Sequence, residues 1–101
     1  IDAEVIDLRS LRPLDGKTII DSVKKTTRLV TVYEGVKTLG IGAEVSALVA
    51  ESEAFGYLDA PILRLGGAES PLPYSPILEK AAVPQTPDIA AAVRDLVAAR
   101  I

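Results

Sequence analysis

The chain has 101 residues, 49% of them hydrophobic and 25% charged, with a formal net charge of −3. This length and balance are typical of a single soluble globular domain. The 11 basic residues are scattered rather than gathered in a stripe, so we expect no nucleic-acid partner. The absence of Cys and His excludes disulfides, thiolate metal sites and histidine-based catalysis. No apolar run approaches the roughly 20 residues of a membrane span, and we expect no membrane partner.

Strands and helices are predicted to alternate from the beginning of the chain. Residues 3–8 (AEVIDL) alternate and contain β-branched side chains, which predicts a buried strand. A Pro-Leu-Asp-Gly turn follows, in which Asp15 can cap a helix over residues 17–25. Residues 28–33 (RLVTVY) are again β-branched and predict a second strand.

The second half of the chain continues this alternation. A glycine-bearing loop over residues 35–42 precedes an amphipathic helix predicted at 43–54. Residues 61–65 predict a third strand, and Ser75-Pro76 opens a short helix to about residue 81. Thr86-Pro87-Asp88 starts the last helix, over residues 88–99, which is predicted to bury Ile89, Val93, Leu96 and Val97.

This order predicts one domain over residues 1–101, with a three-layer α/β/α architecture and a mostly parallel sheet. The predicted strands, 3–8, 28–33 and 61–65, are expected to be mutually parallel. Three strands are few for such a fold, because both faces and both edges of the sheet need cover. We therefore expect that a first strand with its helix, or a partner, is lacking.

No candidate reaction centre emerges from the residues. Gly40-Ile41-Gly42 precedes a helix, but Val45 stands where a dinucleotide-binding turn has its third glycine. Gly66-Gly67 leads into no helix start, so it is interpreted as a turn. The nearby acids Glu51 with Glu53 and Asp2 with Glu4 are interpreted as surface charge. We predict no catalytic, cofactor-binding or metal-binding residue within the chain.

Several motifs together resemble one family, in the same order and at similar spacing. They are EVIDLRSLRPLD at 4–15, VTVYEG at 30–35, GIGAEV at 40–45, LDAP at 58–61, PLPY at 71–74 and Leu78-Glu79. The chain resembles the carboxyl-terminal, transketolase-like domain of beta subunits of thiamine-diphosphate-dependent 2-oxo acid dehydrogenases. Within the family it looks closest to pyruvate dehydrogenase, with the acetoin and branched-chain enzymes as alternatives. It departs from the family at residues 36–39 (VKTL), where relatives commonly carry Trp-Pro, and in lacking a strand and helix before Ile1.

The resemblance implies an assembly and docking role in an enzyme that decarboxylates a 2-oxo acid and passes the acyl group to a lipoyl arm. Thiamine diphosphate and Mg²⁺ would be bound outside this chain, between an alpha subunit and the amino-terminal domain of beta. The implied partners are the alpha subunit, a second beta subunit and the subunit-binding domain of the dihydrolipoyl acyltransferase. By the same resemblance, Asp59 and the terminal carboxylate of Ile101 would lie near the two-fold axis and receive Lys or Arg from that domain. The alternative for Asp59 is a turn cap beside Pro61.

A second function class stays open: a free-standing α/β module that binds a small ligand at the carboxyl ends of its strands. Apolar loop residues favour the assembly role, because they suggest surface that a partner covers: Leu39, Leu72 and Ile77. The expected compartment is the cytoplasm of a bacterium, or the mitochondrial matrix or plastid of a eukaryote.

Overall fold

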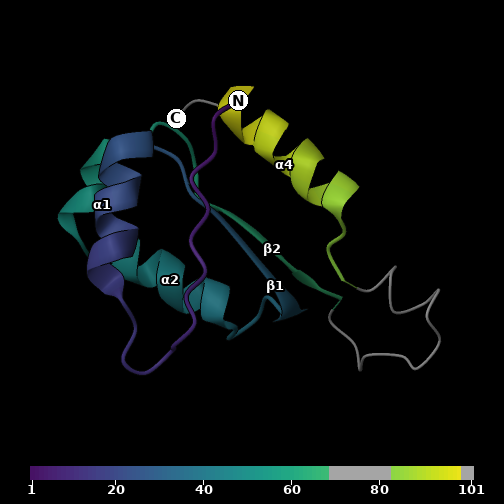
Figure 1. Ribbon diagram of the computed structural model, residues 1–101, viewed down its shortest axis with the longest axis horizontal. Coiled ribbons are helices and arrows are strands. Elements are labelled where there is room, and N and C mark those ends of the chain that lie inside the picture. Colours follow the sequence, from purple (N-terminus) through teal and green to yellow (C-terminus); the bar gives the residue numbers. More distant parts are fainter. Residues whose placement is uncertain (69–82, 99–101) are drawn as a thin grey trace.

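The computed structural model describes residues 1–68 and 83–98. A sheet of two described strands separates helices α1 and α2 on one face from α4 on the other (Figure 1). This arrangement confirms the predicted three-layer α/β class. The elements are α1 Gly16–Thr26, β1 Val30–Val36, α2 Ile41–Ala50, the 3₁₀ helix η1 Glu53–Tyr57, β2 Leu63–Gly67 and α4 Thr86–Ala98.

Strands β1 and β2 are parallel, as predicted. Their register pairs Val30 with Leu63 and Val32 with Leu65, and it shifts before Val36 meets Gly67. Each strand begins two residues later than predicted. For β1 the reason is the left-handed backbone of Thr27 (φ 65°), which turns the chain as α1 ends.

Residues 3–8 do not form the predicted strand. The structure gives residues 1–10 no regular secondary structure, and this segment runs beside the sheet without joining it (Figure 1). Among the described residues β1 pairs with β2 alone, so its other edge is free. A strand exists only with a hydrogen-bonded neighbour, and the alternating pattern of residues 3–8 could not reveal that the neighbour is missing.

The start of α1 follows local capping chemistry as predicted, whereas α4 begins at Thr86, two residues earlier than predicted. The Asp15 carboxylate accepts a hydrogen bond from the backbone N–H of Thr18 at 3.2 Å. At α4, the Asp88 carboxylate accepts from the backbone N–H of Gln85 at 2.9 Å. Helix α2 ends four residues earlier than predicted, because the Ser52 side chain accepts from the N–H of Ala54 and starts η1. The helix predicted at 75–81 lies outside the described residues.

The hydrophobic core joins α1, α2 and η1. Its buried members are Ile19, Val23, Val45, Val49 and Ala54. On the other face α4 buries Leu96, whereas Ile89 and Val93 are only half-buried. The predicted burial of Val97 is wrong, because 43% of this residue is exposed. These α4 side chains border a cavity instead of a closed layer.

Candidate docking surface and adjoining cavity

Asp59 lies in the loop that leads into β2, at the edge of the sheet where both strands begin. Its backbone N–H donates to the carbonyl of Thr27 at 2.9 Å. Thr27 in turn caps α1, its N–H donating to the carbonyl of Val23 at 2.8 Å. The loop is therefore fixed through its backbone, and Asp59 itself is exposed.

The Asp59 carboxylate makes no hydrogen bond or ion pair with the described residues. The turn-cap alternative thus has no contact to support it in this part of the chain. An exposed carboxylate without a partner keeps its full charge available to another molecule.

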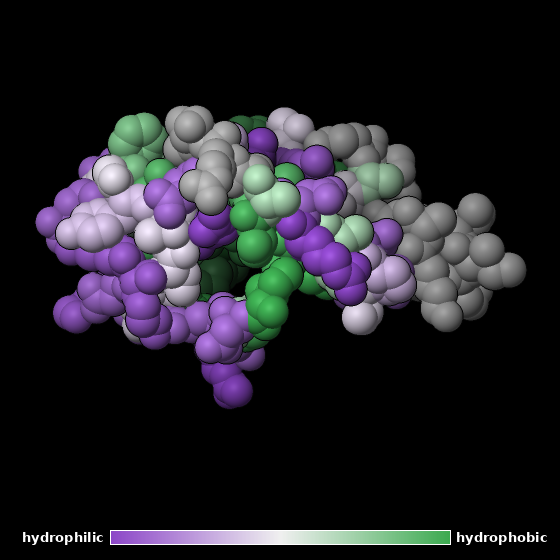
Figure 2. All heavy atoms as spheres, turned by 90° about the horizontal axis from the view of Figure 1, so that it is seen from above, coloured by the Kyte–Doolittle hydropathy of each residue, from purple (hydrophilic) through white to green (hydrophobic). Residues whose placement is uncertain are grey.

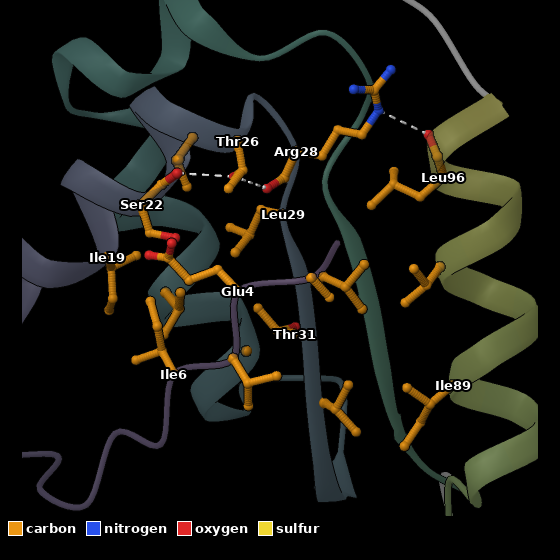
Figure 3. Close-up of a pocket in the computed structure, with 18 of the residues that line it drawn as sticks. Glu4, Ile6, Ile19, Ser22, Thr26, Arg28, Leu29, Thr31, Ile89 and Leu96 are labelled. Carbon is orange, nitrogen blue, oxygen red and sulfur yellow. Dashed lines mark hydrogen bonds between the residues drawn. The ribbon is translucent and has the colours of Figure 1, made fainter. Parts of the chain in front are cut away.

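Arg28 brings the end of α4 to the same edge of the sheet. Its Nε donates to the carbonyl of Leu96 at 3.3 Å (Figure 3). Its Nη2 donates to the carbonyl of Val97, also at 3.3 Å. A cation at this position satisfies carbonyls that a helix end leaves unpaired, and the helix dipole favours it. Because Thr27 and Arg28 are consecutive, they link the Asp59 loop to the last described turn of α4. Ile101, the other predicted docking residue, lies outside the described residues.

Two exposed aromatic side chains of η1 lie in the segment just before Asp59. Phe55 is 61% exposed and Tyr57 is 49% exposed. Lys24 forms an ion pair with Glu53, and its Nζ lies 5.7 Å from the centroid of the Tyr57 ring. The hydrogen bond to Glu53 raises the pKa of Lys24. Neither aromatic residue was predicted from the sequence, although two aromatics within an acidic stretch were a usable signal.

A cavity of about 920 Å³ lies along the free edge of β1, between this strand and the segment formed by residues 1–9. From above, the molecule is hollowed at this place, and the hollow is apolar (Figure 2). Its walls come from both helical layers and include Ile19, Val23, Val45, Ile89, Val93 and Leu96. One residue of a strand between two packed layers occupies about 150 Å³. This is the product of a rise of about 3.3 Å, a strand spacing of about 4.8 Å and a layer spacing of about 10 Å. The cavity therefore has room for a further strand of about six residues.

Glu4 holds the outer wall of this cavity against α1 by an ion pair with Lys25. The hydrogen bond from Lys25, with a smaller one from Ser22, lowers the pKa of Glu4. Figure 3 shows Glu4 beside Ser22. This polar contact tethers residues 1–9, which pair with neither of the described strands.

The cavity does not lie where a small-ligand module of this class would bind. Such sites lie at the carboxyl ends of the strands, which here are Val36 and Gly67. Neither residue lines the cavity, whose β1 contribution ends at Tyr33.

The two glycines at the start of α2 serve packing. Gly40 is the N-cap residue of α2. A Cβ at Gly42 would lie 2.7 Å from Oγ1 of Thr31, so the glycine lets the helix approach β1 closely. This explains Gly40-Ile41-Gly42 without a phosphate.

Within residues 1–68 and 83–98, no group of three acids could hold a metal ion. None of the helices in this part of the chain is long and apolar enough to cross a membrane.

Comparison with known proteins shows the family of this chain. The family model of the transketolase C-terminal domain matches residues 1–89. The chain belongs to this family. It is 56% identical over 94 residues to the mitochondrial pyruvate dehydrogenase E1 component subunit beta of Ascaris suum, covering 93% of this chain and 26% of the relative. The corresponding yeast subunit, from Saccharomyces cerevisiae, is 54% identical over 96 residues, covering 95% of this chain and 26% of the relative.

A bacterial relative gives the same result. The pyruvate dehydrogenase E1 component subunit beta of Rhizobium meliloti is 50% identical over 94 residues, covering 93% of this chain and 20% of the relative. The chain thus spans about a quarter of the length of the curated relatives it matches. The resemblance to a transketolase-like domain of pyruvate dehydrogenase beta subunits is confirmed. The roles of Asp59 and Ile101 stay predictions.

Proposed function

We propose that this chain is the assembly and partner-docking domain in the beta subunit of a thiamine-diphosphate-dependent 2-oxo acid dehydrogenase, specifically a pyruvate dehydrogenase. The observation that carries the proposal is 54–56% identity to such subunits over more than nine-tenths of the chain. The whole enzyme decarboxylates pyruvate and transfers the acyl group to a lipoyl group of an acyltransferase. Thiamine diphosphate and Mg²⁺ are bound by the alpha subunit and the amino-terminal domain of beta.

The docking role is supported by the position of Asp59. An exposed carboxylate that no described residue pairs with suits a Lys or Arg from the subunit-binding domain of the dihydrolipoyl acyltransferase. Arg28 holds the last described turn of α4 at the same edge of the sheet. Ile101 is proposed as a second docking residue by resemblance to the family.

The other proposed partners are the alpha subunit and a second beta subunit. An apolar residue available to them is Leu39, which is 97% exposed. Leu72 and Ile77, predicted to serve the same purpose, lie outside the described residues. The relatives include mitochondrial subunits of eukaryotes and a subunit of a bacterium. We propose the mitochondrial matrix or plastid for a eukaryotic source and the cytoplasm for a bacterial one.

The assembly role is tested by titrating the subunit-binding domain into an assembly of alpha and intact beta subunits. We expect saturable binding that weakens strongly at about 1 M salt, because salt screens charge pairs at this ionic strength. A parallel titration with an apolar dye measures small-ligand binding to the same assembly. Absence of acyltransferase binding, together with a dye-binding site at the carboxyl ends of β1 and β2, would favour the small-ligand alternative.

A further inference from the structure

The segment from η1 to β2 presents alternate side chains to the core and to solvent. Leu58 packs against the core cluster, and Ala60 is completely buried. The backbone of Leu58 is extended (φ −69°, ψ 129°), and successive side chains of an extended backbone point to opposite sides. Tyr57 and Asp59, on either side of Leu58, therefore both point outward. We call these two residues the Tyr57–Asp59 surface.

The charge of this surface is negative, with no balancing cation. Lys24 lies near the Tyr57 ring but is paired with Glu53, so that their charges cancel. Asp59 has no ion pair within the described residues. In sequence, residues 51–59 contain three acids and no basic residue. Charge complementarity therefore selects a basic partner for an exposed aromatic residue that stands two positions before an unbalanced carboxylate.

We propose that the Tyr57–Asp59 surface binds an arginine of the acyltransferase's subunit-binding domain. The guanidinium pairs with the Asp59 carboxylate and stacks on the ring of Tyr57. This inference rests on the proposed function and adds Tyr57 to the docking site. Arginine fits better than lysine, because its planar and weakly hydrated guanidinium can bond a carboxylate and stack on an aromatic face at the same time.

The test is a calorimetric titration of the subunit-binding domain into the assembly of alpha and intact beta subunits. Tyr57→Ala should weaken binding about fivefold to tenfold, as the loss of a partly desolvated cation–π contact does. Tyr57→Leu, which keeps an apolar side chain to support the fold, should weaken it equally. Tyr57→Phe retains the ring and should bind as the wild type does.

Phe55→Ala is the matched control. Phe55 is an exposed aromatic of the same 3₁₀ helix, but it lies about 120° around the axis from Tyr57, since this helix has three residues per turn. Its substitution should leave the affinity unchanged. In an Asp59→Asn background the effect of Tyr57→Ala should shrink, because both residues hold the same arginine.

If both Tyr57→Ala and Tyr57→Leu bound the subunit-binding domain as tightly as the wild type does, the inference would be overturned. It would also be overturned if Tyr57→Ala weakened binding by the same factor with Asp59 as with Asn at position 59. If Asp59→Asn still weakens binding in that case, the proposed docking function stands and only the role of Tyr57 is wrong. If Asp59→Asn also binds normally, the docking function itself fails at this surface.

Discussion

Asp15 is the N-cap residue of α1, and both oxygens of its carboxylate accept hydrogen bonds from Thr18. Oδ1 accepts from the backbone N–H of Thr18 at 3.2 Å, and Oδ2 accepts from its hydroxyl at 2.6 Å. The hydroxyl contact, followed by the backbone contact, lowers the pKa of Asp15. The folded-state pKa is therefore below the unfolded one. The stabilisation from the charged cap is present above the unfolded pKa and is lost as the pH falls through the folded pKa.

Asp15→Asn should reduce this acid sensitivity, because asparagine can cap the helix but does not titrate. We expect the unfolding temperature of the wild type to fall more steeply than that of the variant between about pH 6 and pH 3. Circular dichroism of the intact subunit measures this. Glu44→Gln removes a different exposed acid and serves as the control. Parallel curves for the wild type and Asp15→Asn would show that the cap does not contribute.

At the scale of elements, the helix starts were predictable because their signals are local. Asp15 and Asp88 contact groups within three residues of themselves. The early end of α2 was missed because Ser52 competes with the helix through its side chain. The strand predicted at 3–8 was wrong because pairing depends on distant residues.

The candidate docking surface was predictable only in part. Asp59 was identified from the sequence through family resemblance. The contacts of Arg28 with Leu96 and Val97 join residues 68 and 69 positions apart, and no local pattern predicts them. Tyr57 could be linked to Asp59 only after the extended backbone of Leu58 was known.

The contact between α2 and β1 gives a prediction at this scale. Gly42→Ala should destabilise the intact subunit by about 1–3 kcal/mol, because its Cβ would crowd Oγ1 of Thr31. Adding Thr31→Ala, which removes that oxygen, should recover part of the loss. Gly40→Ala is the contrasting variant, since its Cβ would lie 2.4 Å from the backbone oxygen of Val36 and Thr31→Ala cannot relieve it. Denaturant unfolding of the wild type and of both glycine variants, each with and without Thr31→Ala, measures these effects. If Thr31→Ala restored the stability of both glycine variants equally, the contact between Gly42 and Thr31 would be contradicted.

At the scale of the whole molecule, the free edge of β1 and the cavity beside it are one feature. Apolar side chains from α1 and α4 face this space from opposite sides. An unpaired strand edge next to exposed apolar surface favours association with other chains. The two-stranded described sheet with its cavity is thus compatible with a partial domain of this family.

We therefore expect the isolated 101-residue chain to be aggregation-prone or to unfold without a sharp transition. Extending it at the amino end with the residues that precede this domain in its relatives should produce cooperative unfolding. An extension of equal length made of Gly and Ser is the control and should not. Calorimetric unfolding distinguishes these outcomes, and a sharp two-state transition of the isolated chain would count against the prediction.

The docking role of the domain is tested most directly by the affinity of the intact alpha–beta assembly for the acyltransferase's subunit-binding domain, measured by calorimetry for Asp59→Ala. We expect a loss of at least about 30-fold, which corresponds to about 2 kcal/mol for a charge pair desolvated in an interface. Glu44→Ala, which removes an exposed acid from α2, should bind normally. Decarboxylation with an artificial electron acceptor should be nearly unchanged in both variants. Unchanged affinity of Asp59→Ala would remove Asp59 from the docking site, and lost decarboxylation would show that it serves the fold or the active site instead.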